Sequence, residues 1–305
     1  QWVICLQQVP VSEVIALRKI YEDMNGAEWL QNEEGLPWNF SLSDADTHPC
    51  RPDETGSIWQ RVLCTNRTDT GGGTVCSADN CTIVALDFHE LNDLQGVVPN
   101  EIVYLESLRS LLFGYNVLAD IDGGMPAIFG NLTTLTRLDL FNNDFNGHHI
   151  PEEYSKLVAL EAFEVHECNI SGQFPSVLAS LEALKDLRLT DNPLCASIPD
   201  NIFEKLTDLT RLEMWDCSIT GSLPTSLQSL RKLELLDLEY NQFNSSLYDF
   251  DMPLLHKLAL NKNLFTGSFP FIAGNLKSLE IIECSSTSMS GSLPAAISRL
   301  ASLEI

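Results

Sequence analysis

The sequence predicts an α/β solenoid, in which short repeated units coil around one axis and their strands form a single parallel sheet. Three observations support this fold class: an apolar pattern that returns about every 24 residues, an L-x-L segment in each unit, and a Gly and a Pro that follow it. Because one unit cannot bury its own apolar face, neighbouring units must stack into a continuous core. We therefore expect a right-handed superhelix with a parallel β-sheet on its concave face and a helical cap at its N-terminus.

The repeats occupy residues 84–305, and Leu187–Pro199 shows their pattern most clearly. The alternation of two leucines places both side chains on the same face of a short strand. The first of these core positions recurs nine times, at Leu86, Leu111, Leu138, Phe163, Leu187, Leu212, Leu236, Leu258 and Ile282. A tenth unit begins with Leu300 and Leu303, and no capping sequence follows before Ile305. We therefore expect the natural protein to continue, or to dock a partner, at this end.

An Asn such as Asn192 follows most of the strands, and the residue at this position is expected to turn the chain inward. Its side-chain amide can satisfy buried backbone groups, each of which costs roughly 1–3 kcal/mol when left without a partner. Cys168 and Cys217 take this position in two units, and we interpret them as buried structural thiols. Cys284 falls at an inward strand position and is assigned to the core, whereas Cys195 falls at an outward loop position and is expected to be a free thiol.

Residues 1–83 are expected to cap the first repeat, whose core would otherwise be exposed. The segment Ser12–Asn25 predicts a helix, with Ser12 as its N-cap and Asn25-Gly26 as its end. Its apolar residues share one helical face, namely Val14, Leu17, Tyr21 and Met24. An aromatic, Pro-containing segment follows and is expected to complete the cap.

Two sets of residues carry a family resemblance. The run Ala16-Leu17, Gly26, Trp29, Trp38, Cys50, Trp59, Val62 and Cys64 resembles the N-terminal cap of plant-type extracellular leucine-rich-repeat proteins. The L-x-G-x-I-P repeats resemble the same family, which includes receptor-like kinases, receptor-like proteins and polygalacturonase inhibitors. Gly26-Ala27-Glu28-Trp29 is more similar to protist members. Two features depart from the family pattern: Arg61 stands where the cap usually has Gly, and Thr68–Asn80 is an insertion.

Nine cysteines are present, and four of them cluster in a stretch rich in Thr, Asp and Gly: Cys50, Cys64, Cys76 and Cys81. No CxxC and no nearby His pair accompanies them, so the cluster favours disulfides in an oxidising compartment over zinc. We expect Cys50 to pair with Cys64 and Cys76 with Cys81. Six N-x-[ST] sequons also favour secretion and predict glycans at Asn39, Asn66, Asn80, Asn131, Asn169 and Asn244.

The charge balance limits the partners. With 18 Lys and Arg against 42 Asp and Glu, the net charge is −24, which repels nucleic acid and anionic lipid head groups. A charged partner is therefore expected to be basic, or to be bridged by cations. No apolar run approaches the roughly 20 residues of a membrane span. Gln1 is not an initiator Met and no signal-peptide pattern follows it, so we expect a processed chain or a fragment of an extracellular or cell-surface protein.

The outward positions of each strand are expected to line the concave face. Six of the nine residues between the two core positions are acidic, and aromatic residues stand beside them. Exposed aromatics among carboxylates are common at recognition surfaces. We predict a partner-binding strip of Glu164, His166, Arg188, Glu213, Trp215, Asp216, Asp237, Glu239 and Tyr240, with Trp215 as its anchor. Because all are outward, truncating one is expected to cost little stability, within about 0.5 kcal/mol.

The sequence disfavours catalysis, metals and cofactors. Glu164 and Glu213 could form a glycosidase pair, but we expect an open face on which nothing desolvates a carboxylate. His89 and His166 are three strands apart, or roughly 15 Å, which is too far for one metal ion. We therefore predict no enzyme, no metal and no cofactor.

The predicted function is recognition of a protein, peptide or glycan ligand on the concave face, as in the ectodomain of a receptor-like protein. The sequence leaves two alternatives open. The first is a structural or assembly subunit of a cell wall, appendage or larger complex, with scaffold contacts through the uncapped C-terminal end. The second is an inhibitor of a secreted hydrolase.

Overall fold

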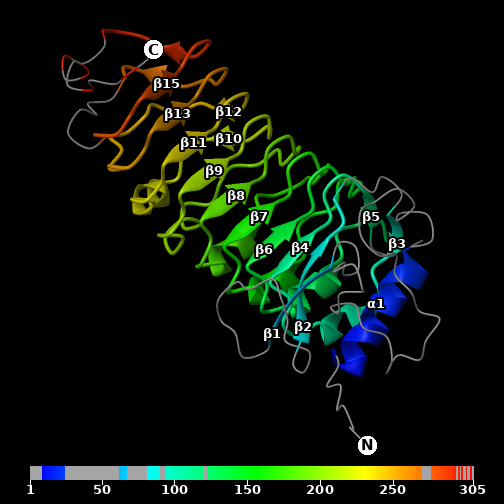
Figure 1. Ribbon diagram of the computed structural model, residues 1–305. Helices are drawn as coiled ribbons and strands as arrows, with labels where there is room; N and C mark the ends of the chain where they lie inside the picture. The colour runs from blue at the N-terminus through cyan, green and yellow to red at the C-terminus, as the bar shows by residue number, and fades with distance from the viewer. Residues whose placement is uncertain are drawn as a thin grey trace, which may run out of the picture.

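The expected solenoid is observed in a computed structural model, which describes residues 9–24, 62–66, 81–89, 94–119, 122–269 and 276–292, together with 295, 297, 300 and 303. Within these residues, ten strands form one sheet that runs along the length of the molecule, with α1 beside its N-terminal end (Figure 1). The strands, in spatial order, are β1 (Val62–Asn66), β2 (Cys81–Asp87), β4 (Ser110–Leu112), β6 (Arg137–Asp139), β7 (Ala162–Glu164), β8 (Asp186–Arg188), β9 (Arg211–Glu213), β11 (Leu235–Asp237), β13 (Lys257–Ala259) and β15 (Ile281–Glu283).

The predicted repeat frame is confirmed by the register of the sheet. From β2 onward every pair of neighbouring strands is parallel, and the first core positions from Leu86 to Ile282 lie directly opposite one another. Their side chains are fully buried except for Ile282, which is 5% exposed. The leucines therefore form one continuous column of the core, as stacking of incomplete units requires.

The return path of each unit crosses the convex side through short elements. Three two-stranded pairs join β3 (Gln95–Val97) to β5 (Val117–Ala119), β10 (Thr220–Gly221) to β12 (Gln242–Phe243), and β14 (Thr266–Gly267) to β16 (Ser288–Met289). The 3₁₀ helices are η1 (Asn100–Tyr104), η2 (Ala127–Asn131), η3 (Glu152–Lys156), η4 (Ser176–Ser180) and η5 (Thr225–Ser229). Each of these helices follows a proline directly, because the fixed φ of proline suits the residue that begins a helical turn.

The inward-turning position works as predicted. Asn192 donates through Nδ2 to the carbonyls of Val165 and Leu189 at 2.8 and 2.7 Å, and its Oδ1 accepts from the backbone of Cys168 and Ile170. In the preceding repeat, Cys168 takes the position of this Asn, and its thiol donates a hydrogen bond to the Leu140 carbonyl where an Asn side-chain amide would donate. Burial raises the pKa of this thiol to about 12, so its role is structural.

The other thiols outside the cap also follow the frame. Cys217 is fully buried and donates to a carbonyl in the same way as Cys168. Cys195 is an exposed free thiol, as expected. Cys284 packs against the core but is only half-buried.

The predicted cap helix is present as α1 (Val11–Asp23). It begins after Pro10, and no side chain caps its first turn, so the assignment of Ser12 as N-cap was wrong. Glu13 is 2% exposed, and its carboxylate accepts hydrogen bonds from Thr82 Oγ1 at 2.6 Å and the Ile83 amide at 3.0 Å. Together with Val14, Leu17 and Met24, all fully buried, this contact joins α1 to β2 and covers the end of the core.

Much of the predicted cap lies outside the described residues. The expected boundary between residues 83 and 84 falls within β2, and this division of the chain stays a prediction. Cys64 in β1 is disulfide-bonded to a partner outside the described residues. Because Cys50 and Cys76 also lie outside them, the pairings Cys50–Cys64 and Cys76–Cys81 remain predictions. The departures at Arg61 and Thr68–Asn80 lie outside as well.

Candidate binding face

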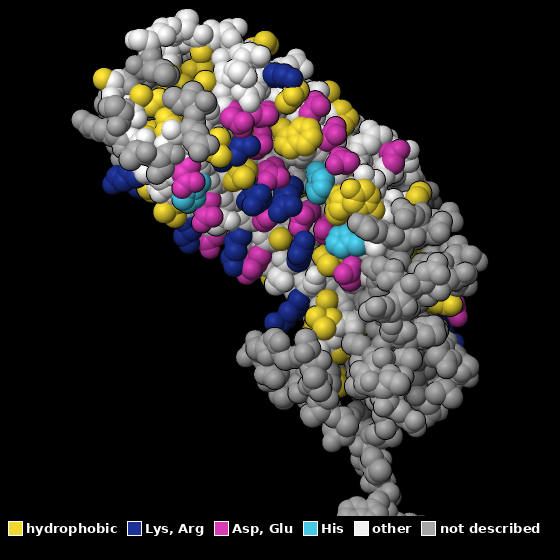
Figure 2. All heavy atoms as spheres, turned by 45° about the horizontal axis from the view of Figure 1, so that its top comes forward, with side chains coloured by type: hydrophobic (Ala, Val, Ile, Leu, Met, Phe, Trp, Pro, Cys, Tyr) yellow, Lys and Arg dark blue, Asp and Glu magenta, His cyan; other side chains and the backbone are white. Residues whose placement is uncertain are grey.

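The concave face carries three rows of outward side chains. The first row lies between the two core positions of each strand and runs in register through Asp87, Leu112, Asp139, Glu164, Arg188, Glu213, Asp237, Ala259 and Glu283. The second and third rows follow two and three residues later in each unit. Figure 2 shows acidic and basic side chains interleaved over the sheet, with hydrophobic and histidine side chains beside them.

The carboxylates of the first row form ion pairs with basic side chains, and we call this set of carboxylates the paired row. Glu164 is 6% exposed, and its two oxygens contact the guanidinium groups of Arg137 at 2.8 Å and Arg188 at 3.2 Å. Arg188 also binds Asp186 at 2.9 Å. Since Glu164 is buried between two cations, the expectation that every strip residue lacks a structural role was wrong for this carboxylate.

The pairing continues toward the C-terminus. Arg211 contacts Glu213 at 2.6 Å, and the Lys257 ammonium lies 3.1 Å from Glu283 and 3.9 Å from Asp237. The basic partners Arg137, Arg211 and Lys257 stand two residues before the first-row positions in their own strands. The acidic count of the first row therefore overstates its free negative charge.

Asp237 contradicts the expectation that nothing on this face desolvates a carboxylate. Burial raises its pKa to about 6, although the backbone amide of Glu239 donates to it at 3.2 Å and lowers the pKa. The charges of Glu239 and Glu213 raise the pKa, and Lys257 lowers it. A carboxylate on this face can thus be partly protonated near neutral pH.

Three third-row carboxylates, Glu167, Asp191 and Asp216, have different surroundings, and we call them the unpaired row. Among the described residues, no ion pair joins them to a basic side chain, and Glu167 only accepts a hydrogen bond from the Asn142 amide at 3.0 Å. Burial raises the pKa of Asp191, and the negative charges of Asp216 and Glu167 raise it further. All three residues have left-handed backbone, with φ of 55°, 57° and 52°, because each directly precedes the inward-turning residue. This row leaves negative charge without a counterion.

Aromatic side chains stand next to the unpaired row. Trp215 and Tyr240 are outward, as predicted, with 36% and 44% of their surfaces exposed. The Lys262 ammonium lies 4.0 Å from the Tyr240 ring centroid and donates to its hydroxyl. The predicted strip omits Tyr115 and Phe141, whose rings pack edge-to-face at 4.6 Å. Aromatic residues in adjacent outward positions were the sequence signal for them.

His166 joins this aromatic group but is incompletely bonded. Its ring stacks on Phe141 at 4.4 Å, and burial lowers its pKa. The buried Nδ1 of His166 has no hydrogen-bond partner, and neither has Oγ1 of the next second-row residue, Thr190, which is 4% exposed. Buried polar groups are normally paired, so these two atoms are exceptions among the described residues.

His89 has a different environment from His166. Its ring nitrogens contact Asp87 at 3.1 Å and Asp139 at 2.9 Å, and these hydrogen bonds raise its pKa to about 9. Phe141 lies between the two histidine rings. Within the described part of the chain, no group of three His, Cys, Asp or Glu is placed to hold a metal ion.

Three of the six predicted glycan sites have side chains among the described residues. Asn131, Asn169 and Asn244 have exposed side chains, whereas Asn39 and Asn80 and the side chain of Asn66 are outside the described residues. The helices described in the structure include none long and apolar enough to cross a membrane.

Comparisons with known proteins agree with this architecture. Residues 182–243 match the family model described as Leucine rich repeat. TMV resistance protein N of Nicotiana glutinosa is 39% identical over 64 residues, which are 21% of this chain and 5% of that protein. The fold is therefore a leucine-rich-repeat solenoid, and the short sequence matches do not assign a function.

Solved structures give the same fold over most of the chain. The Arabidopsis receptor kinase HAESA, in complex with the peptide hormone IDA and the co-receptor SERK1, has a TM-score of 0.64 and 22% identity, covering 96% of this chain and 52% of that chain. A plant ice-binding protein has a TM-score of 0.63 and 21% identity, with coverages of 95% and 90%. The peptide hormone receptor RGFR1, in complex with RGF2, has a TM-score of 0.50 and 27% identity, with coverages of 70% and 43%. The chain thus spans about half the length of these two receptor chains.

Proposed function

We propose that this protein is an extracellular recognition module that binds a peptide or protein partner on its concave face, as the ectodomain of a receptor-like protein. The observation that carries the proposal is the exposed Trp215 beside the unpaired Asp191 and Asp216. Tryptophan is enriched among residues that dominate binding energy. Two solved structures of the same fold hold peptide hormones, which supports a peptide as the ligand class.

The charge distribution supports a basic group on the partner. Asp191 and Asp216 are adjacent like charges without a counterion among the described residues, so a bound cation would relieve their repulsion. A guanidinium or ammonium group can at the same time stack on the face of Trp215.

The same geometry supports a binding role rather than a catalytic one. Glu164 and Glu213, which could have served as a pair of catalytic carboxylates, are each held by an arginine. A carboxylate that acts as a general acid or base must reach the substrate, and the oxygens of these two carboxylates are already in contact with guanidinium groups. We therefore propose no reaction at this pair.

The proposal is tested by Trp215→Ala. Partners are captured with the immobilised folded protein from the extracellular fluid of the source organism, identified, and prepared in pure form for titration. Because the indole is outward, we expect a nearly unchanged melting temperature and a loss of roughly 2 kcal/mol in binding, or about 30-fold in Kd. Leu264→Ala is the matched control, since Leu264 is exposed to 52%, and it should bind normally.

The outcomes separate the competing functions. Normal binding by Trp215→Ala would contradict the proposed role of Trp215 as the anchor on the concave face. Capture of the protein in stoichiometric complexes with a wall or appendage component would support the structural alternative. Capture of a secreted hydrolase that loses activity on binding would support the inhibitor alternative.

A further inference from the structure

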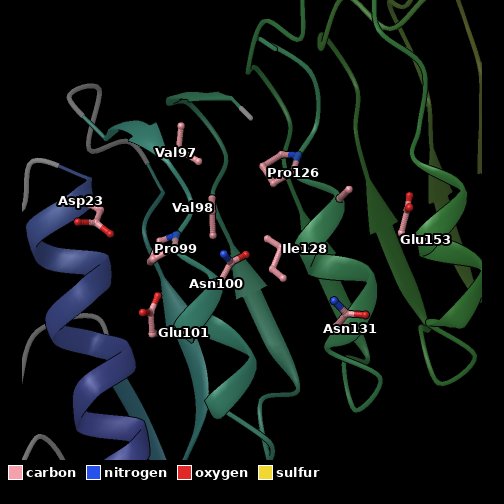
Figure 3. A pocket seen from close by; sticks show the side chains of 11 residues that line it. Asp23, Val97, Val98, Pro99, Asn100, Glu101, Pro126, Ile128, Asn131 and Glu153 are labelled. Carbon is pink, nitrogen blue, oxygen red and sulfur yellow. The ribbon is translucent and has the colours of Figure 1, made fainter. Parts of the chain in front are cut away.

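A groove lies on the opposite side of the solenoid from the binding face. It has a volume of about 660 Å³ and opens between the end of α1, strand β3 and the 3₁₀ helices η1, η2 and η3 (Figure 3). The side chains around it come from Asp23, Val97, Val98, Pro99, Asn100, Glu101, Pro126, Ala127, Ile128, Asn131 and Glu153. The groove therefore joins the cap helix to the first repeats.

The lining combines apolar walls with hydrogen-bonding groups. Val97 is 39% exposed, and Ala127 and Ile128 are half-buried, whereas Pro99 and Pro126 are buried. Carboxylates and amides stand around these walls, while none of the described residues that line the groove is basic. A neutral sugar suits this combination, because a pyranose ring has apolar C–H faces and hydroxyl groups on its edge.

Asn131 lines this groove and begins the sequon Asn131-Leu132-Thr133. Its Oδ1 accepts a hydrogen bond from the Lys156 ammonium at 3.2 Å, which orients the side-chain amide. Figure 3 shows the amide nitrogen turned toward the side of η1 and the oxygen turned away from it. Within the described residues, Nδ2 donates no hydrogen bond, so the atom that would carry a sugar is available.

Another sequon of the array provides a contrast. The Nδ2 of Asn169 donates to Asp144 at 2.9 Å, so a sugar there would disturb an existing hydrogen bond. Asn169 is also absent from the lining of the groove. Asn131 thus combines a sequon, an available nitrogen and an adjacent cavity.

We propose that Asn131 carries an N-linked glycan whose first sugar units lie in this groove. The inference depends on the proposed secretory location. In the transfer, Asn131 Nδ2 forms a bond to C1 of the first sugar of a lipid-linked oligosaccharide pyrophosphate, the C1–O bond to the pyrophosphate breaks, and the amide loses one proton. The bound sugars then cover Val97 and Ile128 and link η1 to η2.

Glycopeptide mass spectrometry is done on the protein isolated from its source organism, and hydrogen exchange on wild type and variants secreted from eukaryotic cells. Thr133→Ala removes the sequon but keeps Asn131, and Thr133 is exposed, so folding should be unaffected. We expect a glycan at Asn131 in the wild type, and exchange at least threefold faster over Asn100–Tyr104 and Ala127–Asn131 in the variant. Ser246→Ala, which removes the Asn244 sequon, should leave exchange in these segments unchanged.

Three results would overturn the inference in distinguishable ways. A bare Asn131 with glycans at Asn169 or Asn244 removes the proposed site but keeps the secretory location. A glycan at Asn131 whose loss leaves hydrogen exchange unchanged, also in Asn131→Gln, shows that the sugar lies outside the groove. A protein without any glycan contradicts the secretory location as well. For each of these results, partner binding by the concave face is tested independently with Trp215→Ala, so that the proposed function is judged separately from the glycan.

Discussion

The paired row and the unpaired row lie on the same sheet, only a few residues apart in each repeat, yet their surroundings are opposite. In the paired row, Glu164 is buried between Arg137 and Arg188 at 2.8 and 3.2 Å. In the unpaired row, Asp191 and Asp216 face each other without a cation within the described residues. Acidic residues of one repeat frame can therefore have different roles: those of the first row join neighbouring repeats through ion pairs, and those of the third row are the ones that we propose to bind a partner's cation.

The largest expected difference is in stability and concerns Glu164. We expect Glu164→Gln to lower the free energy of unfolding by roughly 2 kcal/mol. This lies between the ~0.2–1 kcal/mol of an exposed pair and the ~3–5 kcal/mol lost when a buried pair is broken, because the carboxylate is buried while the Arg137 side chain is 47% exposed. Urea unfolding measures the change. As a control, Glu161→Gln, whose pair with Lys185 is exposed, should change stability by less than about 0.5 kcal/mol. Equal effects of the two variants would contradict a structural role for the paired row.

The second expected difference is a pH dependence at the N-terminal end of the paired row. The hydrogen bonds that the His89 ring donates to Asp139 and Asp87 raise its pKa to about 9, above the ~6.5 of an unfolded chain. Its charged form therefore stabilises the fold fully below pH ~6.5, and this contribution is lost as the pH rises toward 9. We expect the stability difference between wild type and His89→Gln to shrink from pH 6 to pH 8.5 in urea unfolding. A difference that grows with pH would mean that His89 is neutral in the folded protein.

The smallest expected effect on stability is in the unpaired row. Asp191→Asn with Asp216→Asn removes a repulsion and no ion pair, so unfolding should change by less than about 0.5 kcal/mol. Thermal unfolding of this double variant is compared with that of Glu152→Gln and Glu153→Gln, which remove two charges from the convex side. A strong loss of stability would show that these carboxylates hold the fold, and the distinction between the two rows would fail.

The repeat frame could be predicted because it depends on local patterns. A period of two within the strand and about 24 between strands determines which side chains are inward, and the sheet register confirmed every first core position. The inward Asn and the thiols that replace it follow from the same frame. The start of α1 could not be predicted as well, because Ser12 is a good N-cap residue, but Pro10 begins the helical turn earlier.

The electrostatics of the face could be predicted only in part. Glu164 forms ion pairs with Arg137 and Arg188, which lie on the two neighbouring strands. The pattern of outward and inward positions within one strand does not predict such contacts between strands. Desolvation of Asp237 is likewise a property of the packed neighbours. The exposed positions of Trp215 and Tyr240 were predicted, because exposure follows directly from the frame.

The central claim, that the unpaired row and Trp215 receive a cationic group, can be tested without an identified partner. The probe is the tripeptide amide Ac-Gly-Arg-Gly-NH2, titrated against the protein while the indole N–H signal of Trp215 is followed by NMR and assigned with Trp215→Phe. Its neutral counterpart has citrulline in place of arginine. We predict that the arginine peptide shifts the Trp215 signal and binds at least tenfold more tightly than the citrulline peptide, and that Asp191→Asn with Asp216→Asn abolishes this preference. Equal binding of both peptides, or an unchanged preference in the double variant, would contradict the claim.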